Sequence, residues 1–222
     1  MTARPLAFST SMVRALREGR KTQTRRVVQL NDAERVRRAA RQWHLDDPNA
    51  TLGCPYGQSG DLLWVREHCA TWEGEHRDVV YRADVDDGDW QDLLHDRRIG
   101  APWSVRGSRY MPRWASRMTL LLTNVSLERV QEITGEDAIE EGSYLGRCAC
   151  GVMRCNSNVL DAAFRQEWCI HHGTEFRFIW DSINAKRGHG WDTNPWVWVL
   201  AFETIHRNVD DILSASQQEE HQ

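Results

Sequence analysis

A lysine, two threonines and several arginines are concentrated in residues 19–26 of this chain, GRKTQTRR. A threonine hydroxyl is a weak nucleophile at neutral pH, so catalysis by Thr24 would require a nearby base. Lys21 can act as that base when desolvation, or a neighbouring cation such as Arg26, lowers its pKa. The same residue types are also typical of a solvated surface, where Lys and Arg near a helix C-terminus offset the helix dipole.

Two secondary-structure elements are expected to position this segment. A short amphipathic helix precedes it, with Ser11 able to cap its start and Gly19 suited to the left-handed position that ends it. The β-branched residues that follow the arginines predict a strand. If residues 22–28 are extended, Thr24 and Arg26 share one face, and the residues between them point the other way.

A second polar segment, residues 133–142 (ITGEDAIEEG), predicts a short helix. Thr134 is suited to cap its N-terminus, and the acidic residues of the first turn match the positive end of the helix dipole. Glu140 and Glu141 follow at the other end. Most exposed glutamates belong to solvated helix faces, and that interpretation applies to these residues too.

The G-x-K at residues 19–21, followed by a threonine and an arginine, resembles the signature of the ASCH domain, a PUA-like fold associated with RNA. The longer pattern G-R-K-T-x-T-x-R is similar to the small bacterial ASCH amidohydrolases that remove the acetyl group from N4-acetylcytidine. Thr24 supports this branch, because many other ASCH domains carry an acid at that position. The resemblance implies that Lys21, Thr24 and Glu141 are catalytic, with Glu140 as the alternative to Glu141.

Five further segments are similar to larger ASCH proteins of phages and prophages, and they lie at residues 54–58, 60–67, 112–117, 180–184 and 194–199. The resemblance implies an α+β fold built on a PUA-like mixed β-barrel, with peripheral helices and a Cys-rich insertion. A single domain is expected over residues 1–206, followed by an acidic tail at 207–222 that is mobile or a lone helix. Insertions are expected near 31–50, 84–110 and 143–173.

Length and composition agree with one compact domain. The chain has 222 residues, of which 41% are hydrophobic, enough to bury a core without a second domain. No apolar run approaches the length of a membrane span, and the N-terminus lacks a signal-peptide pattern. We therefore expect a cytoplasmic protein with no membrane partner, used in the host cytoplasm if a phage encodes it.

The net charge of −4 conceals a basic region, because residues 1–42 contain eleven Lys and Arg against three acids. Such a patch can attract phosphates, although a pI near 6.1 argues against tight binding of duplex nucleic acid. A modified nucleoside or single-stranded RNA is the better partner. The expected substrate-binding residues are two arginines of this region and two tryptophans suited to stack on a base, namely Arg20, Arg26, Trp64 and Trp114. Core packing is the alternative role for each tryptophan.

Hydrophobic patterning predicts the remaining elements. Strands are expected at residues 61–66, 79–82, 118–129 and 196–202, where apolar and β-branched runs are bounded by polar turns. A helix is expected at 174–183, where apolar side chains recur at helical spacing. The acids, glycines and proline of 84–107 predict a long loop.

A cysteine-rich segment indicates a possible structural zinc site. Its candidate ligands are Cys148, Cys150, Cys155 and Cys169, with His171 and His172 as alternatives for the fourth position. Four such ligands can form a closed tetrahedral zinc site. Reduced thiols without metal are an equal alternative, because the spacing is not the paired CxxC of a zinc ribbon. No organic cofactor is indicated, and the distant Cys54 and Cys69 are expected to be buried as small apolar residues.

Three classes of function are consistent with these features. The first is an amidohydrolase that removes an acyl group from N4-acetylcytidine or a related modified nucleoside. The second is a non-catalytic module that binds RNA or a modified base, and the third is a zinc-stabilised phage accessory protein that acts through protein contacts. We favour the first class, which predicts that Lys21, Thr24 and Glu141 converge in one pocket.

Overall fold

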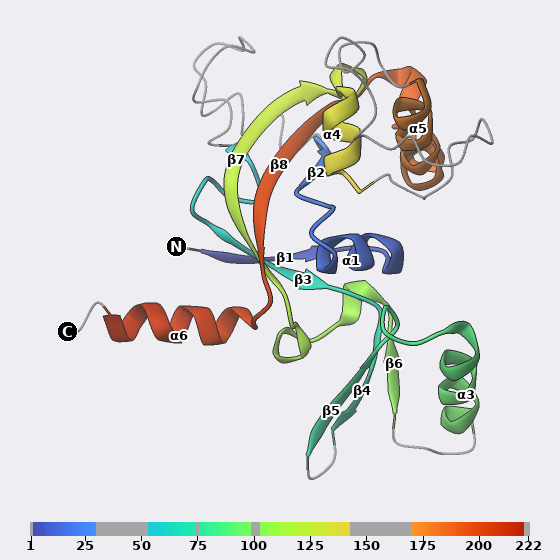
Figure 1. Cartoon of the computed structure of the whole chain (residues 1–222), viewed down its shortest axis with the longest axis vertical. Helices are drawn as coiled ribbons and strands as arrows, with labels where there is room; N and C mark the ends of the chain where they lie inside the picture. Colours follow the sequence, from blue (N-terminus) through green and yellow to red (C-terminus); the bar gives the residue numbers. More distant parts are fainter. Residues whose placement is uncertain (1, 30–52, 74–75, 99–102, 143–169, 220–222) are drawn as a thin grey trace, which may run out of the picture. The chain divides into compact units, whose positions relative to one another are not determined.

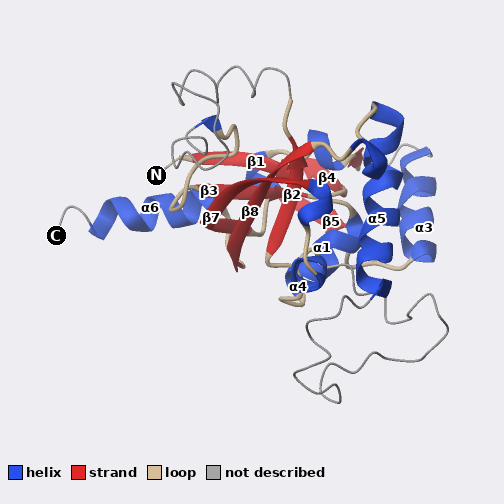
Figure 2. Cartoon of the chain, turned by 90° about the horizontal axis from the view of Figure 1, so that it is seen from above, coloured by secondary structure: helices blue, strands red, loops and turns tan. Residues whose placement is uncertain are grey.

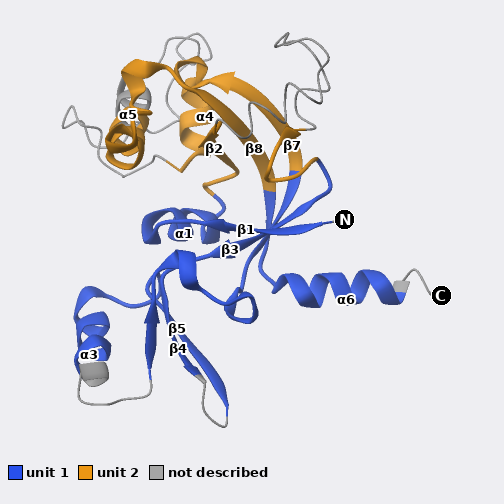
Figure 3. Ribbon diagram, turned by 180° about the vertical axis from the view of Figure 1, so that it is seen from behind, with its two compact units in different colours: residues 1–19, 59–122, 203–222 blue, residues 20–58, 123–202 orange. Residues whose placement is uncertain are grey.

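The computed structural model describes residues 2–29, 53–73, 76–98, 103–142 and 170–219, and the chain divides into two compact units (Figure 3). Unit 1 comprises residues 1–19, 59–122 and 203–222, and unit 2 comprises residues 20–58 and 123–202. The described chain contains both helices and strands (Figure 2), so the predicted α+β class is confirmed.

The strands and helices are labelled in Figure 1 in the order in which they occur along the chain. The strands are β1 (Ala3–Ala7), β2 (Gln23–Val27), β3 (Leu62–Arg66), β4 (Cys69–Glu73), β5 (Arg77–Tyr81), β6 (Ser104–Arg106), β7 (Thr119–Arg129) and β8 (Trp196–Ile205). The α-helices are α1 (Thr10–Arg17), α3 (Asp87–Arg98), α4 (Gly135–Glu140), α5 (Ile170–Asn184) and α6 (Val209–Glu219). Short 3-10 turns occur at Ser108–Tyr110, Arg113–Ala115, Val130–Glu132, Ala185–Arg187 and Trp191–Thr193.

Hydrogen bonding joins the described strands into two sheets, one in the order β1-β3-β7-β8-β2 and the other in the order β5-β4-β6. In the larger sheet, β1 runs parallel to β3, whereas β3 and β7, and β2 and β8, pair antiparallel. Both sheets are open within the described residues. The closed barrel expected from the sequence is therefore not found in this part of the chain.

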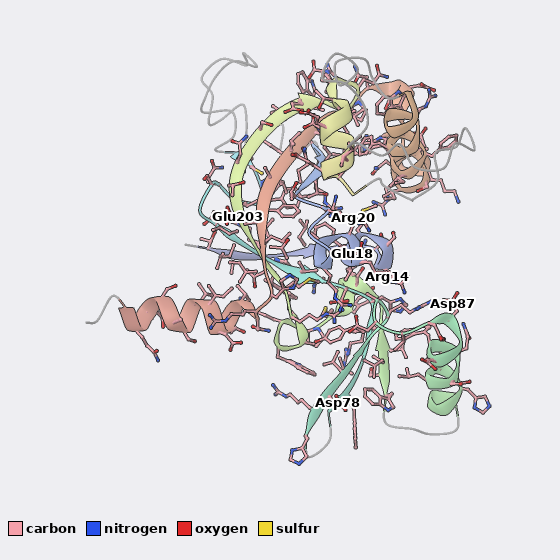
Figure 4. All side chains as sticks on the ribbon, viewed as in Figure 1. Arg14, Glu18, Arg20, Asp78, Asp87 and Glu203 are labelled. Carbon is pink, nitrogen blue, oxygen red and sulfur yellow. The ribbon has the colours of Figure 1, made fainter. Side chains whose placement is uncertain are left out.

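In unit 1, one residue stabilises each end of α1, and the sequence prediction is confirmed for Gly19 but wrong for Ser11. Ser9, rather than Ser11, accepts a hydrogen bond from the Met12 amide and caps the helix. Gly19 follows the helix with φ of 68°, a left-handed conformation that glycine adopts without strain. Arg14, labelled in Figure 4, donates from α1 to the carbonyl of Ala83 at 3.0 Å.

The polar interior of unit 1 is organised around Arg117. Its guanidinium binds the buried carboxylate of Glu67 through two hydrogen bonds of 2.8 and 2.9 Å. It also pairs with Asp84 and lies over the ring of Tyr81, 3.8 Å from the centroid. Because every polar group in this cluster has a charged or hydrogen-bonded partner, we interpret it as a structural link.

The C-terminal segment of unit 1 forms α6 and is packed. Val209 is fully buried, and Ile212 and Leu213 pack with it against Leu62 and Trp64 of β3. Asp210, Asp211 and Glu219 of the predicted acidic tail lie on this helix, so residues 209–219 form a helix that packs against β3.

The segment predicted as a long loop was assigned wrongly, because it contains α3 and β6. Among the described side chains of α3, only Trp90 is fully buried, beside His68 and under Arg82. A helix with one buried side chain lacks the apolar residues repeated at helical spacing from which a helix is predicted. β6 is only three residues long and is equally hard to detect.

In unit 2, the core lies between one face of β2 and β8 and the helices α4 and α5. It is formed by Val27, Val130, Ile133, Ala138, Phe176, Trp180, Val197 and Val199. The predicted strands at 196–202 and 118–129 and the helix at 174–183 are confirmed as β8, β7 and α5. Antiparallel pairing of Val27 with Val197, and of Arg25 with Val199, fixes which β2 side chains face the helices.

Candidate active site

Lys21 and Glu141 are brought together by backbone pairing in unit 2. They form an isolated antiparallel bridge, and the adjacent Thr22 amide donates to the carbonyl of Glu140 at 2.9 Å. Glu141 is the C-terminal cap residue of α4, and its amide donates to the carbonyl of Asp137 at 2.8 Å. The segment before β2 is thus tied to the end of α4.

The start of α4 is fixed by the capping predicted from the sequence. The Thr134 hydroxyl accepts from the Asp137 amide at 3.1 Å, and the Asp137 carboxylate accepts from the Thr134 amide at 3.0 Å. This reciprocal pair satisfies two backbone donors at the helix N-terminus. It also fixes the position of Asp137, which faces β2.

Lys21 is buried with all three ammonium hydrogens directed at acceptors. Its side chain is 1% exposed, and Nζ donates to the Glu141 carboxylate oxygen Oε2 at 2.6 Å. Nζ also donates to the backbone carbonyls of Gln23 and Glu141, each at 2.8 Å. The Gln23 carbonyl belongs to the peptide that leads into Thr24, so the amine lies beside the backbone of the candidate nucleophile.

The surroundings of Lys21 lower its pKa below the ordinary value of 10.5, chiefly because burial removes the hydration of the ammonium. The charge and hydrogen bond of Glu141 oppose this effect, whereas the positive charges of Arg26 and Arg25 add to it. The ion pair and the neutral amine–acid pair differ only by a proton moving along the 2.6 Å contact. The pair can therefore present a base and an acid together.

Arg25 lies on the face of β2 that packs against α4, and its side chain is also 1% exposed. Its Nη2 atom is 3.1 Å from Asp137 Oδ2 and 3.4 Å from Glu128 Oε2. Its Nη1 atom donates to Gln23 Oε1 at 3.0 Å and lies 3.5 Å from Glu141 Oε1. Arg25 thus connects three carboxylates on neighbouring elements.

Gln23 completes this network. Its Nε2 atom donates to Asp137 Oδ1 at 2.9 Å and to Glu140 Oε2 at 2.5 Å. Glu140, the alternative catalytic glutamate, therefore contacts Gln23, whereas the Lys21 amine is bonded to Glu141. The hydrogen bonds from Gln23 and Thr134 and the charge of Arg25 lower the pKa of Asp137 despite its partial burial.

Thr24 and Arg26 alternate to the opposite face of β2, as the sequence predicts. Thr24 is buried and pairs with Leu200, and Arg26 pairs with Trp198. Desolvation lowers the pKa of Arg26, although Tyr56 and Glu141 act in the opposite direction. Among the described residues, the Thr24 hydroxyl forms no hydrogen bond with Lys21 or Glu141.

The predicted substrate-binding residues are distributed over both units. Arg20 is half-buried next to Lys21 in unit 2. Trp64 is packed in the β3–α6 core of unit 1, and Trp114 packs near Met111 with Arg77 5.2 Å from its ring centroid. The observed contacts of both tryptophans are packing contacts, and stacking on a base stays a prediction.

The predicted zinc ligands Cys148, Cys150, Cys155 and Cys169 lie outside the described residues. His171 and His172 belong to α5, whose first side chains are likewise not described. In the described part of the chain, no three His, Cys, Asp or Glu side chains gather into a metal-binding group. Cys54 and Cys69 are buried, as predicted.

Sequence reasoning missed the roles of Gln23, Arg25 and Asp137. Asp137 carried a usable signal, since an acid three residues after a capping threonine is fixed in position by the cap. Gln23 and Arg25 were expected to point away from Thr24. Their contacts depend on which helix covers that face of β2, which strand alternation alone does not reveal.

No family model, curated protein or solved structure matches this chain. The ASCH resemblance therefore rests on the sequence motifs. No helix within the described ranges has the length and apolar character needed to cross a membrane.

Proposed function

We propose that this protein is an ASCH-type amidohydrolase that removes the acyl group from N4-acetylcytidine or a related modified nucleoside. The observation that carries the proposal is the buried Lys21–Glu141 pair, with Nζ and Oε2 2.6 Å apart. A buried lysine with a lowered pKa is hydrogen-bonded to the Glu141 carboxylate and to the backbone carbonyl that precedes Thr24, so it supplies the base that a hydroxyl nucleophile needs for amide hydrolysis.

The reaction begins with transfer of one proton from Lys21 Nζ to Glu141 Oε2. The Thr24 hydroxyl then attacks the acyl carbon while its proton moves to the neutral Lys21 amine. The bond between the acyl carbon and the exocyclic N4 breaks, and N4 takes the proton held by Glu141. The products of this half-reaction are the free cytosine amine and an acyl ester on Thr24.

Water completes the cycle by attacking the ester carbon. One water proton goes to the Glu141 carboxylate, and the Thr24 oxygen recovers its proton from Lys21. One proton then returns from Glu141 to Lys21, which restores the ion pair. The net reaction converts one amide and one water into a carboxylic acid and an amine. In a simpler variant, Lys21 and Glu141 activate water directly and Thr24 only positions the carbonyl.

The motif order also supports a PUA-like topology as the finer description of the fold. The α4 segment that carries Glu141 and the turn that carries Lys21 come in the order found in the small ASCH amidohydrolases. Arg20 and Arg26, next to the pair, are the proposed contacts to the base or ribose of the substrate.

A panel of N4-acylated cytidines and other modified nucleosides tests this function by chromatographic detection of the free amine. We expect the parent protein to release cytidine from N4-acetylcytidine, Thr24→Ser to retain much of the activity and Thr24→Ala to lose it. If Thr24→Ala retains activity, the mechanism in which Lys21 and Glu141 activate water directly would be favoured. A parent protein that is inert on the whole panel, but binds nucleotides with an affinity that falls as salt rises, would favour the non-catalytic binding module.

A further inference from the structure

Glu141 uses its two carboxylate oxygens differently. Oε2 is 2.6 Å from the Lys21 amine, whereas Oε1 accepts no hydrogen bond from any described residue, although it is buried. Nη1 of Arg25 lies 3.5 Å from Oε1. The orientation of the carboxylate therefore depends on where the Arg25 guanidinium is held.

Arg25 is held from two sides by the side chains of Gln23 and Asp137. Gln23 Oε1 accepts from Nη1 at 3.0 Å, and Asp137 Oδ2 lies 3.1 Å from Nη2. Gln23 also donates to the other oxygen of Asp137, at 2.9 Å, so the three side chains form a closed ring of contacts. A planar guanidinium with both ends engaged has little freedom to turn.

We propose that Gln23 and Arg25 are positioning residues, which hold the Glu141 carboxylate so that Oε2 faces the Lys21 amine. The catalytic importance of this positioning rests on the proposed function, because the orientation of Glu141 affects the rate only when the pair exchanges a proton with a substrate. The orientation of the Glu141 carboxylate toward the Lys21 amine can be tested without a substrate. Neither side chain is placed in contact with the substrate.

Gln23 offers the cleaner test, because it is neutral. Replacing it leaves every charge near Lys21 unchanged, including those of Glu141, Arg25 and Arg26. Any change in the titration of Lys21 must then come from altered geometry. Arg25 variants that lose the charge would instead change the Coulomb interaction as well.

The sequence makes Lys21 directly observable. Lys21 and Lys186 are the only lysines in the chain, and Lys186 is exposed. Protein labelled with 13C at the lysine ε-carbon therefore gives two lysine resonances, and a Lys186→Arg sample identifies the one from Lys21. The Lys186 signal serves as an internal reference for pH.

We expect the titration midpoint of Lys21 to fall by about one pH unit in Gln23→Met, because a loosened Glu141 stabilises the ammonium less. Glu141→Gln should lower it further. Gln131→Met is the matched control, since it removes a different glutamine contact in unit 2, the 2.9 Å bond to the Trp191 carbonyl, and should leave the midpoint unchanged. If Gln23→Met does not fold, Gln23→Thr gives the same test, because threonine suits a strand but is too short to reach Arg25.

Activity supplies the second readout. If N4-acetylcytidine is a substrate, Gln23→Met should lower kcat about tenfold or more with little change in KM. A parent protein without turnover, combined with a lowered Lys21 midpoint in Gln23→Met, would reject the proposed function and retain the positioning of the pair. A folded Gln23→Met protein with the parental Lys21 midpoint would overturn this inference, whatever the activity.

Discussion

Replacing either Lys21 or Glu141 alone should destabilise the protein more than replacing both residues together. The two side chains are 1% and 8% exposed, and Nζ and Oε2 are 2.6 Å apart. At an effective dielectric constant of about 20, this separation gives a gross attraction of about 6 kcal/mol. Desolvation of the two ions offsets much of this attraction, so the net contribution of the pair is small even though each ion depends on the other.

The single variants remove the attraction while leaving one buried charge. In Lys21→Met, Glu141 loses its closest hydrogen-bonded partner among the described residues and retains Arg25 at 3.5 Å. We expect a loss of about 3 kcal/mol, the lower end of the range for a broken buried pair. Glu141→Gln keeps a hydrogen-bond acceptor for the amine, and we expect a loss of about 2 kcal/mol.

The double variant Lys21→Met/Glu141→Gln leaves no unpaired charge, and we expect it to lie within about 1 kcal/mol of the parent. Urea denaturation at neutral pH measures the four free energies of unfolding, and the double-mutant cycle gives the coupling between the two sites. Lys186→Met is the control for loss of a lysine, because Lys186 is exposed. The reasoning fails if the losses of the two single variants simply add in the double variant.

Three further predictions concern pH, thiol chemistry and metal. Since the pKa of Lys21 in the folded protein is below its ordinary value of 10.5, the unfolded chain binds the extra proton between the two values. The free energy of unfolding of the parent, relative to Lys21→Met, should therefore rise with pH across that window in urea titrations; a fall would contradict the lowered pKa. Burial raises the pKa of Cys69 to about 11, so mass spectrometry should find it alkylated at pH 8 only as fast as the protein unfolds, and rapid labelling of folded protein would refute this. Metal analysis of protein purified without added zinc should find about one ion per chain if the cysteines of 148–169 bind it, and well under one ion would reject that site.

The elements that carry repeated apolar signals could be predicted from the sequence. β7 and β8 have long β-branched or apolar runs, and α5 places Phe176 and Trp180 one turn apart on its buried side. The cap of α4 was equally visible, since Thr134 and Asp137 have the required spacing. Each of these signals is local, which is why the chain alone reveals it.

Features that depend on long-range pairing were harder to foresee. α3 has a single buried residue, Trp90, among its described side chains, and β6 has only three residues. Neither element therefore shows a periodic pattern of apolar residues in the sequence. At the candidate site, the sequence suggested Lys21 and Glu141 only through a family resemblance. It did not suggest the contacts of Arg25, because its partners Glu128 and Asp137 are more than a hundred residues away in the chain.

The most direct test of the central claim compares initial rates of N4-acetylcytidine hydrolysis by the parent and by variants that change one member of the pair. We predict that Lys21→Met and Glu141→Gln each lose at least about a hundredfold in kcat, because each removes a group that transfers a proton in the reaction. Lys186→Met, which removes the other lysine, should retain the parental rate. Folded Lys21→Met protein that hydrolyses the substrate as fast as the parent would contradict the proposed mechanism.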